Sequence, residues 1–317
     1  MALPDGWRGR LRVPVIGAPM FLVSGVELVA AQCLGGVLGT FPSLNARSTE
    51  AYRDWLAELG ARLDGVATAA PFGVNLIVHR SNRRLDADLA ATVAARVPLV
   101  VTSLGAARDV VAAVHGYGGL VFHDVINRRH AEKAAAAGVD GLIGVAAGAG
   151  GHAGTLNPFA LLAELRAVFA GPIALAGCIN TGRQIAAALM AGADLAYVGT
   201  RFLATRESLA AAGHKDMILA AQAADIVYTK AVSGVAANFL ARSLEAAGID
   251  PAAPDAGPGS GHALDLGTEA RAWRDIWSAG QGVGGIADLP AAGDLCARLV
   301  AEYRAALAGA AAAGSPP

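Results

Sequence analysis

Short, almost continuously apolar stretches recur along the first two-thirds of the chain, separated by longer alanine-rich stretches. The apolar stretches lack the alternation of a strand with one solvated face, so they predict strands buried on both faces, as in a parallel sheet. The eight predicted strands are Pro14–Ala18, Gly36–Thr40, Phe72–Ile77, Leu99–Ser103, Leu120–Asp124, Gly141–Ala146, Ile173–Ala176 and Leu195–Gly199.

The stretches between these strands predict helices, several of them followed by the glycine that helix C-termini prefer. The predicted helices are Ser24–Cys33, Thr49–Leu59, Leu85–Arg96, Ala106–His115, Arg128–Ala137, Phe159–Phe169 and Arg183–Ala191. Eight strands alternating with helices predict an α/β fold of the (β/α)8 TIM barrel type. A doubly wound open sheet is the alternative, but no G-x-G-x-x-G motif follows the first predicted strand.

The alternation stops after residue 205, where we expect a small, mostly helical insert that covers the barrel mouth. In this segment we predict helices at Ala204–Ala224 and Ala236–Ala247, an extended piece at Asp225–Tyr228 and a loop at Pro251–Gly261. Helices at Glu269–Ser278 and Leu289–Ala308 are expected to return and complete the outer ring of the barrel. The expected domain bounds are 1–205 and 271–308 for the barrel, 206–270 for the insert and 309–317 for a disordered tail.

Composition limits the class of protein. The 317 residues are 54% hydrophobic and 16% charged, which predicts a large core wrapped in alanine-rich helices. Every apolar run is shorter than the roughly 20 residues that cross a bilayer, and Met1–Arg12 lacks the apolar segment of a secretory signal. We therefore expect a cytoplasmic protein without a membrane partner.

Charge and cysteine content exclude further classes. A net charge of −1 gives no electrostatic reason to expect nucleic acid or an anionic membrane as partner. Cys33, Cys178 and Cys296 form neither a CxxC pair nor a cysteine–histidine cluster with metal-ligand spacing. We expect reduced thiols and no metal site.

Candidate chemistry gathers at the C-terminal ends of the predicted strands, where barrel enzymes place their active sites. His152 stands among four glycines in the segment Gly148–Gly154, directly after a predicted strand. Glycines let a flat ligand approach the backbone, and an imidazole there is suited to proton transfer near neutral pH. His152 is therefore the candidate catalytic residue.

Two further strand ends carry features of a phosphate site. Gly177 and Gly199 follow the seventh and eighth predicted strands, the usual position of phosphate-binding backbone N–H groups in barrels, and Thr200 adds a hydroxyl. The pair favours a cofactor that carries one phosphate, and flavin mononucleotide (FMN) suits an apolar barrel mouth.

Together these residues resemble the signatures of the nitronate monooxygenase family, formerly called 2-nitropropane dioxygenase. The resemblance extends from Pro14 to about Leu299. It lies in Ala18-Pro19-Met20, Phe72-Gly73-Val74-Asn75-Leu76, Ala149-Gly150-Gly151-His152-Ala153-Gly154, Gly192-Ala193-Asp194 followed by Gly199-Thr200-Arg201-Phe202, and Trp277-Ser278-Ala279-Gly280-Gln281-Gly282.

The resemblance implies an FMN-dependent TIM barrel and assigns roles by motif. His152 matches the family's catalytic base. The implied cofactor-binding residues are Pro19, Met20, Asn75, Val145, Gly150, Gly151, Gly177, Cys178, Gly199, Thr200 and Gln281. There are departures, because the family often has a polar residue at Val145, a lysine in some members at Asp124 and more usually a glycine at Cys178.

Two substrate-pocket candidates are less firmly placed. His123 ends the fifth predicted strand beside Asp124, and since strand neighbours point to opposite faces, we expect only one of the two to line the pocket. Tyr228 lies in the insert and is a candidate to reach over the flavin, as are Lys230 and Asn238. Trp277 is expected to serve packing.

The implied activity is oxidative denitrification of alkyl nitronates or nitroalkanes with O2, catalysed by a monomer or homodimer. The flavin-dependent enoyl-acyl carrier protein reductases and some quinone reductases look similar, so an NAD(P)H-dependent reductase of an enoyl thioester or quinone is the alternative. A non-catalytic flavin-binding barrel is a second alternative, which would not require His152.

Overall fold

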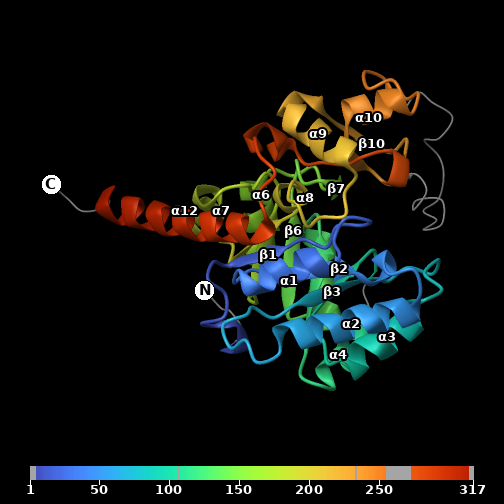
Figure 1. Ribbon diagram of the computed structural model, residues 1–317, viewed down its shortest axis with the longest axis vertical. Coiled ribbons are helices and arrows are strands. Elements are labelled where there is room, and N and C mark those ends of the chain that lie inside the picture. Colours follow the sequence, from blue (N-terminus) through green and yellow to red (C-terminus); the bar gives the residue numbers. More distant parts are fainter. Residues whose placement is uncertain (1–4, 106–107, 233, 255–272, 314–317) are drawn as a thin grey trace.

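A ring of eight parallel strands forms the centre of the protein (Figure 1). The computed structural model describes residues 5–105, 108–232, 234–254 and 273–313. The ring consists of β1 (Val15–Gly17), β2 (Leu38–Pro42), β3 (Gly73–Ile77), β4 (Leu99–Ser103), β5 (Leu120–Val125), β6 (Gly141–Val145), β8 (Ile173–Ala176) and β9 (Leu195–Val198). Strand β9 pairs with β1 and closes the barrel, so the predicted TIM barrel is confirmed.

The barrel is filled by alternate residues of its strands. Ile16 lies in register with Leu38 on one side and Tyr197 on the other, and all three are buried inside the ring. Trp7 packs against Phe122, with ring centroids 5.7 Å apart, and belongs to the same interior cluster. This interior is a packed core, so a ligand finds space at the end of the barrel rather than along its axis.

Helices cover the outside of the ring and match the predicted helices to within a few residues. They are α1 (Val26–Leu34), α2 (Thr49–Leu63), α3 (Leu85–Ala94), α4 (Arg108–His115), α5 (Arg128–Ala137), α6 (Pro158–Arg166), α7 (Gly182–Met190) and α12 (Ala292–Ala313). Side-chain caps fix several starts: Ser48 accepts from Ala51 N–H, and Thr181 and Gln184 form a capping box. No helix among the described residues is long and apolar enough to span a bilayer.

The segment after β9 contains less helix than expected. Within the predicted helix Ala204–Ala224, the α-helix is α9 (Ala212–Ala220). The short helix α8 (Thr200–Leu203) lies just before this segment. The helix predicted over Ala236–Ala247 is wrong in its first half, where β11 (Ala237–Leu240) precedes α10 (Ala241–Ala246). Local alanine content favoured a helix there, but pairing with two strands determines the conformation.

Those partners form a second, three-stranded antiparallel sheet over the barrel. Strand β11 lies between β10 (Ile226–Thr229), which confirms the predicted extended piece, and β7 (Gly151–His152). Figure 1 shows α9, α10 and β10 gathered at one end of the barrel. The short helix η5 (Gln281–Gly285) follows this region before the chain returns in α12.

Some expectations fall wholly or partly outside the described residues. The loop predicted at Pro251–Gly261 is described only to Pro254, and the helix predicted at Glu269–Ser278 only from Trp273. Helix α12 continues to Ala313, into the expected tail, and its C-terminal half projects from the body (Figure 1).

The contact between α7 and α12 gives a test of the packing. A Cβ atom at Gly182 would lie 2.1 Å from the backbone nitrogen of Tyr303 and 2.5 Å from the carbonyl oxygen of Leu299. We predict that Gly182→Ala lowers the free energy of unfolding by about 1–3 kcal/mol, because backbone atoms cannot move aside without disturbing α12.

Gly60→Ala is the matched control for urea unfolding of this variant. Gly60 is exposed within α2, and a Cβ there would meet nothing within 4 Å. Alanine is the better helix former by about 1 kcal/mol, so this variant should be neutral or more stable. Equal stability of Gly182→Ala and the unsubstituted protein would show that α7 and α12 are not closely packed.

Candidate functional site

A cavity of about 850 Å³ opens at the C-terminal ends of the barrel strands, under the insert. Its volume lies near the upper end of the roughly 300–1,000 Å³ range of ligand pockets. It brings together nearly all of the predicted site residues. Those that line it are Pro19, Met20, Asn75, His123, Val145, Gly150, Gly151, His152, Gly177, Cys178, Gly199, Thr200 and Tyr228.

The Gly148–Gly154 loop forms one wall of this cavity and is tied to the insert. Within it, β7 pairs with β11, so that His152 lies opposite Ala237 and Gly151 opposite Asn238. The Asn238 amide donates to the carbonyl of Ala149 over 2.7 Å, and the Tyr228 hydroxyl donates to the carbonyl of Ala153 over 3.0 Å. Bonds on both sides of His152 therefore fix the backbone from which its imidazole projects.

Ser278 adds a third tie to the same loop. Its hydroxyl oxygen accepts from Gly151 N–H over 2.7 Å and donates to the carbonyl of Asn238 over 2.6 Å. The His214 ring stacks on Trp277 at 5.3 Å and pairs through Nε2 with the Ser278 carbonyl oxygen over 2.9 Å. Burial lowers the pKa of His214 to about 4, so this imidazole is neutral and structural near neutral pH.

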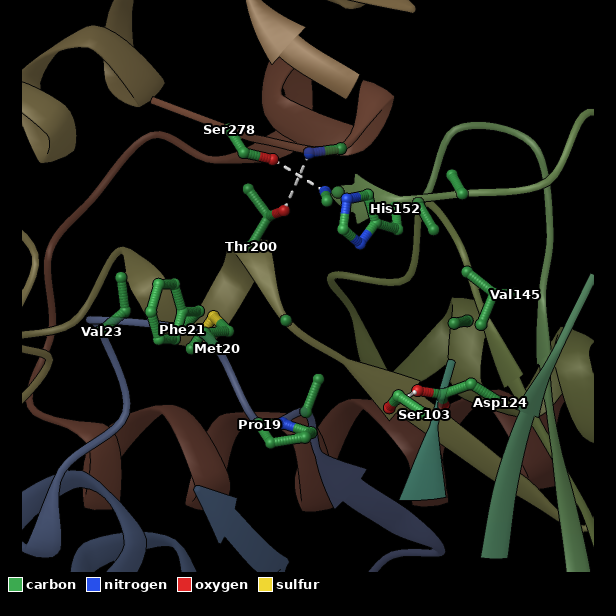
Figure 2. Close-up of a pocket in the computed structure, with 18 of the residues that line it drawn as sticks. Pro19, Met20, Phe21, Val23, Ser103, Asp124, Val145, His152, Thr200 and Ser278 are labelled. Atoms are coloured by element: carbon green, nitrogen blue, oxygen red, sulfur yellow. Dashed lines mark hydrogen bonds between the residues drawn. The ribbon is translucent and has the colours of Figure 1, made fainter. Parts of the chain in front are cut away.

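The imidazole of His152 faces the cavity. Figure 2 shows it between Ser278, on the insert side, and Val145, at the end of a barrel strand. Trp273 packs against it edge to face, with ring centroids 5.4 Å apart. A histidine held by backbone pairing and one aromatic contact, with an apolar residue below, is positioned to exchange a proton with a bound molecule.

Unpaired backbone donors lie at the ends of β8 and β9. Gly177 and Cys178 both have positive φ, +129° and +55°, which turns the chain sharply after β8. Within the described part of the chain, the N–H groups of Gly177, Cys178 and Gly199 donate to no acceptor. Successive backbone N–H groups in such a turn form a concave site for an anion. These donors lie where the sequence predicted a phosphate site.

Three loops approach one another closely beside these donors. A Cβ at Gly280 would lie 2.7 Å from the Gly148 carbonyl oxygen, and one at Gly150 would lie 2.9 Å from Gly280 nitrogen. Gly280 N–H donates to Thr200 Oγ1 over 3.0 Å, so this hydroxyl keeps its proton for another partner. Gln281 is not among the lining residues, and its backbone N–H donates to the Gly148 carbonyl.

A row of polar side chains crosses three neighbouring strands at the base of the cavity. Asn75 on β3 donates to Ser103 Oγ on β4 over 2.8 Å, and Ser103 donates to Asp124 Oδ2 on β5 over 2.5 Å. Burial raises the pKa of Asp124 to about 6, against the opposing effects of the Ser103 bond and His152. The departures at Asp124 and Val145 thus both lie within the cavity wall.

The expectation that only one of His123 and Asp124 lines the pocket is wrong. The two side chains do alternate, since Asp124 bonds to Ser103 and His123 Nδ1 pairs with Thr102 Oγ1 over 2.7 Å. However, the cavity widens over the end of β5 toward α5, so it also reaches His123. Burial lowers the pKa of His123 to about 4, which keeps this histidine uncharged.

Several lining residues were not predicted from sequence: Ser103, His214, Trp273 and Ser278. Ser103 could have been predicted, because it ends a predicted strand. Its side chain points inward, as do those of Leu99 and Val101 at the preceding alternate positions. Ser278 lies in the Trp277–Gly282 segment that resembles the family signature, but its role as a hydrogen-bond partner depends on residues distant in sequence. The contacts of His214 and Trp273 are likewise long-range. Within the described ranges, no three histidine, cysteine or acidic residues are grouped to hold a metal ion.

The fold and the cavity together define a TIM barrel whose mouth carries a histidine and, within the described residues, backbone N–H groups without an acceptor. Residues 83–302 match the family model described as nitronate monooxygenase. A nitronate monooxygenase of Paraburkholderia phytofirmans is 30% identical over 92% of this chain and 92% of its own length. The chain therefore belongs to the nitronate monooxygenase family, whose members are flavoprotein oxidoreductases, and it is an oxidoreductase.

Solved structures agree with this membership. A nitroalkane oxidase from Streptomyces ansochromogenes superposes with a TM-score of 0.78 at 29% identity, over 96% of this chain and 100% of that one. FabK from Thermotoga maritima gives a TM-score of 0.79 at 25% identity, over 96% of both chains. A 5-hydroxy-7a-methyl-1-oxo-octahydro-1H-indene-4-carboxyl-CoA dehydrogenase from Rhodococcus jostii is 31% identical over 72% of this chain and 62% of its own length.

The ties of the glycine-rich loop generate a prediction. Ser278→Ala removes two hydrogen bonds and leaves the Gly151 N–H and the Asn238 carbonyl without this partner. We expect the free energy of unfolding to fall by about 1–3 kcal/mol, as for other unsatisfied buried groups. Chemical denaturation measures this change.

Ser81→Ala is the control, because Ser81 pairs only locally with His79 in a half-buried loop outside the cavity lining. It should change stability by less than about 0.5 kcal/mol. If both serine variants unfold alike, Ser278 does not hold the loop.

Proposed function

We propose that this protein is an FMN-dependent nitronate monooxygenase that catalyses the oxidative denitrification of alkyl nitronates or nitroalkanes with O2. The observation that carries the proposal is the position of His152, in a wall of the cavity that also contains the free N–H donors of Gly177, Cys178 and Gly199. Family membership and the nitroalkane oxidase fold neighbour support it.

The residues present fit FMN. Free N–H groups at the ends of β8 and β9, with the Thr200 hydroxyl, suit a phosphate, and Cys178 keeps the positive φ that the turn requires. Apolar side chains of Pro19, Met20 and Val145 suit the flat face of a ring. When bound, FMN supplies the electron acceptor for the oxidation.

The protein's own task is to orient the substrate and to accept a proton. A nitroalkane carries an acidic hydrogen on the carbon next to its nitro group, and the imidazole of His152 accepts this proton. The strand pairing of β7 and the ring of Trp273 hold this imidazole in place while the proton moves. A nitronate has already lost that proton, so its oxidation does not require the base.

This difference between the two substrates gives a test of His152. We predict that His152→Asn keeps FMN but lowers kcat/KM for a neutral nitroalkane by about 10²–10⁴-fold, the usual contribution of a general base. Turnover of the matching preformed nitronate should fall far less, and this provides an internal control. Equal losses on both substrates, or no loss on either, would remove His152 from proton abstraction.

A second candidate function is reduction of an enoyl thioester or quinone by NAD(P)H. The similarity to FabK and to a carboxyl-CoA dehydrogenase favours considering it, as does a cavity with room for more than one ligand. Both functions require FMN, so cofactor content alone does not separate them.

Anaerobic mixing of the flavin-loaded protein separates the two. We predict that an alkyl nitronate bleaches the flavin absorbance rapidly, whereas NADH and NADPH bleach it slowly or not at all. Rapid bleaching by a reduced nicotinamide together with no response to nitronates would establish the reductase instead.

A further inference from the structure

Four aliphatic side chains line one part of the cavity rim. They end or follow four neighbouring strands of the ring, and they are Leu22 after β1, Leu44 after β2, Ile77 on β3 and Leu104 after β4. We call these four residues the aliphatic wall. His152 follows β6 and the backbone donors follow β8 and β9, so the wall and the candidate chemistry lie on different sides of one cavity.

The wall contributes little to the packing of the protein itself. Leu22 and Leu104 are each 37% exposed. No member of the wall belongs to a buried hydrophobic cluster of the described residues. Leu209 of the insert, which is 56% exposed, also lines the cavity and lies beside the loop of Leu22, since its N–H donates to the Val23 carbonyl over 2.9 Å. Apolar side chains that stay exposed together at a cavity indicate a surface for a ligand.

Leu22 and Leu104 also have an unfavourable backbone conformation. Their φ angles are +60° and +66°, in the left-handed region where the Cβ of a bulky residue comes too close to a carbonyl oxygen. Glycine or asparagine adopts this conformation at lower cost. Such strain persists where the surrounding structure imposes it, and it clusters at ligand sites. Neither packing nor backbone conformation explains why leucine stands at these two positions, whereas contact with an apolar ligand does.

Asn45 holds the turn at Leu22 in place. Its side-chain oxygen accepts from Leu22 N–H over 2.8 Å, and its amide donates to the carbonyl oxygens of Met20 and Ser24 over 2.9 and 2.8 Å. Figure 2 shows Met20 and Phe21, which lead into Leu22, on one side of the cavity and His152 on the other. The Leu22 side chain therefore reaches the cavity from a fixed backbone, on the side away from His152.

The turn at Leu104 changes the side to which this residue points. In a continuing strand Leu104 would point to the opposite face from Ser103, but both residues line the cavity. The left-handed conformation bends the chain directly after β4, and a Cβ at Gly105 would lie 2.4 Å from the Val78 carbonyl oxygen, so the turn is packed against the end of the neighbouring strand. The strained turn thus brings to the rim a leucine that a regular strand would direct away from it.

We propose that the aliphatic wall is a substrate subsite for an unbranched alkyl chain attached to the carbon that carries the nitro or nitronate group. The inference rests on the proposed function and deepens it, because it assigns a substrate class: medium-chain primary nitroalkanes and their nitronates, longer than nitropropane. With the reacting carbon beside His152, the chain crosses the cavity and buries its methylenes against the wall. Leu22 and Leu104 are the specificity-determining residues.

The dependence of activity on chain length tests this subsite. For a series of alkyl nitronates from ethyl to octyl, we expect kcat/KM of the FMN-loaded protein to rise about fourfold per methylene, the gain from burying one CH2 group. A wall that does not contact the substrate gives a flat series, and this result would overturn the proposal.

The double variant Leu22→Asn/Leu104→Asn assigns the effect to the wall. Asparagine has nearly the size of leucine, favours the left-handed backbone and presents an amide instead of methyl groups, so the variant should fold and should unfold in urea no earlier than the unsubstituted protein. The octyl-to-ethyl ratio of kcat/KM should fall by roughly tenfold, the contribution of about two methylenes. Leu34→Asn changes an exposed leucine of α1 outside the cavity lining, and this matched control should leave the ratio unchanged.

Two results in the double variant would overturn the subsite. One is an unchanged ratio with FMN bound normally, and the other is weaker FMN binding with an unchanged ratio, because the two leucines would then contact the flavin instead of the substrate.

Turnover of no nitronate of any length would instead contradict the proposed function. In that case the flavin absorbance, titrated with unreactive n-alkyl carboxylates of the same lengths, still tests the wall. Dissociation constants that fall with chain length in the unsubstituted protein, but not in the double variant, would support the subsite, and constants independent of chain length would overturn it.

Discussion

The pairing of β9 with β1 is the constraint on which the site depends. It closes the sheet. The ends of the eight strands, from Gly17 on β1 to Val198 on β9, therefore meet around one opening although they lie far apart in the sequence. The interior below that opening is filled by residues such as Ile16, Phe122 and Tyr197. The space for a ligand therefore lies at the rim, lined by short segments from most of the strands.

The insert holds in place the loop that carries His152. The loop that carries His152 is glycine-rich and would have many conformations by itself, because glycine restricts the backbone least. Part of this loop, β7, pairs with strand β11. Asn238 and Ser278 form hydrogen bonds with backbone groups of the same loop. His152 is thus part of a sheet rather than of a free loop. Ordering the loop costs conformational entropy, and the contacts of the insert offset this cost.

Much of the barrel could be predicted from the sequence, because many of its strands are local signals: an apolar run such as Leu195–Val198, bounded by Asp194 and Gly199. The cavity residues followed from the rule that strand ends meet. The expectation was wrong where long-range strand pairing overrides local composition. Ala237–Leu240 lies in alanine-containing sequence that favours a helix, but it forms a strand. The roles of Ser278 and His214 depend on contacts with residues far away in sequence, which no local pattern encodes.

The departures from the family pattern are also informative at the level of single residues. Cys178 has a left-handed backbone with φ of +55°, so the turn after β8 is made without a glycine at this position. Val145 makes the wall next to His152 apolar, while Asp124 places an acid at the base of the same cavity. The hydrogen bonds from Asn75 to Ser103 and from Ser103 to Asp124 form a polar row at this base.

The central claim is that the rim of the closed barrel binds FMN with its phosphate at the ends of β8 and β9. A crystal structure of the protein with FMN tests this most directly. We expect the phosphate to accept hydrogen bonds from the N–H groups of Gly177, Cys178 and Gly199 and the ring to lie within reach of His152. A phosphate bound elsewhere, or a cavity that stays empty at saturating FMN, would contradict it.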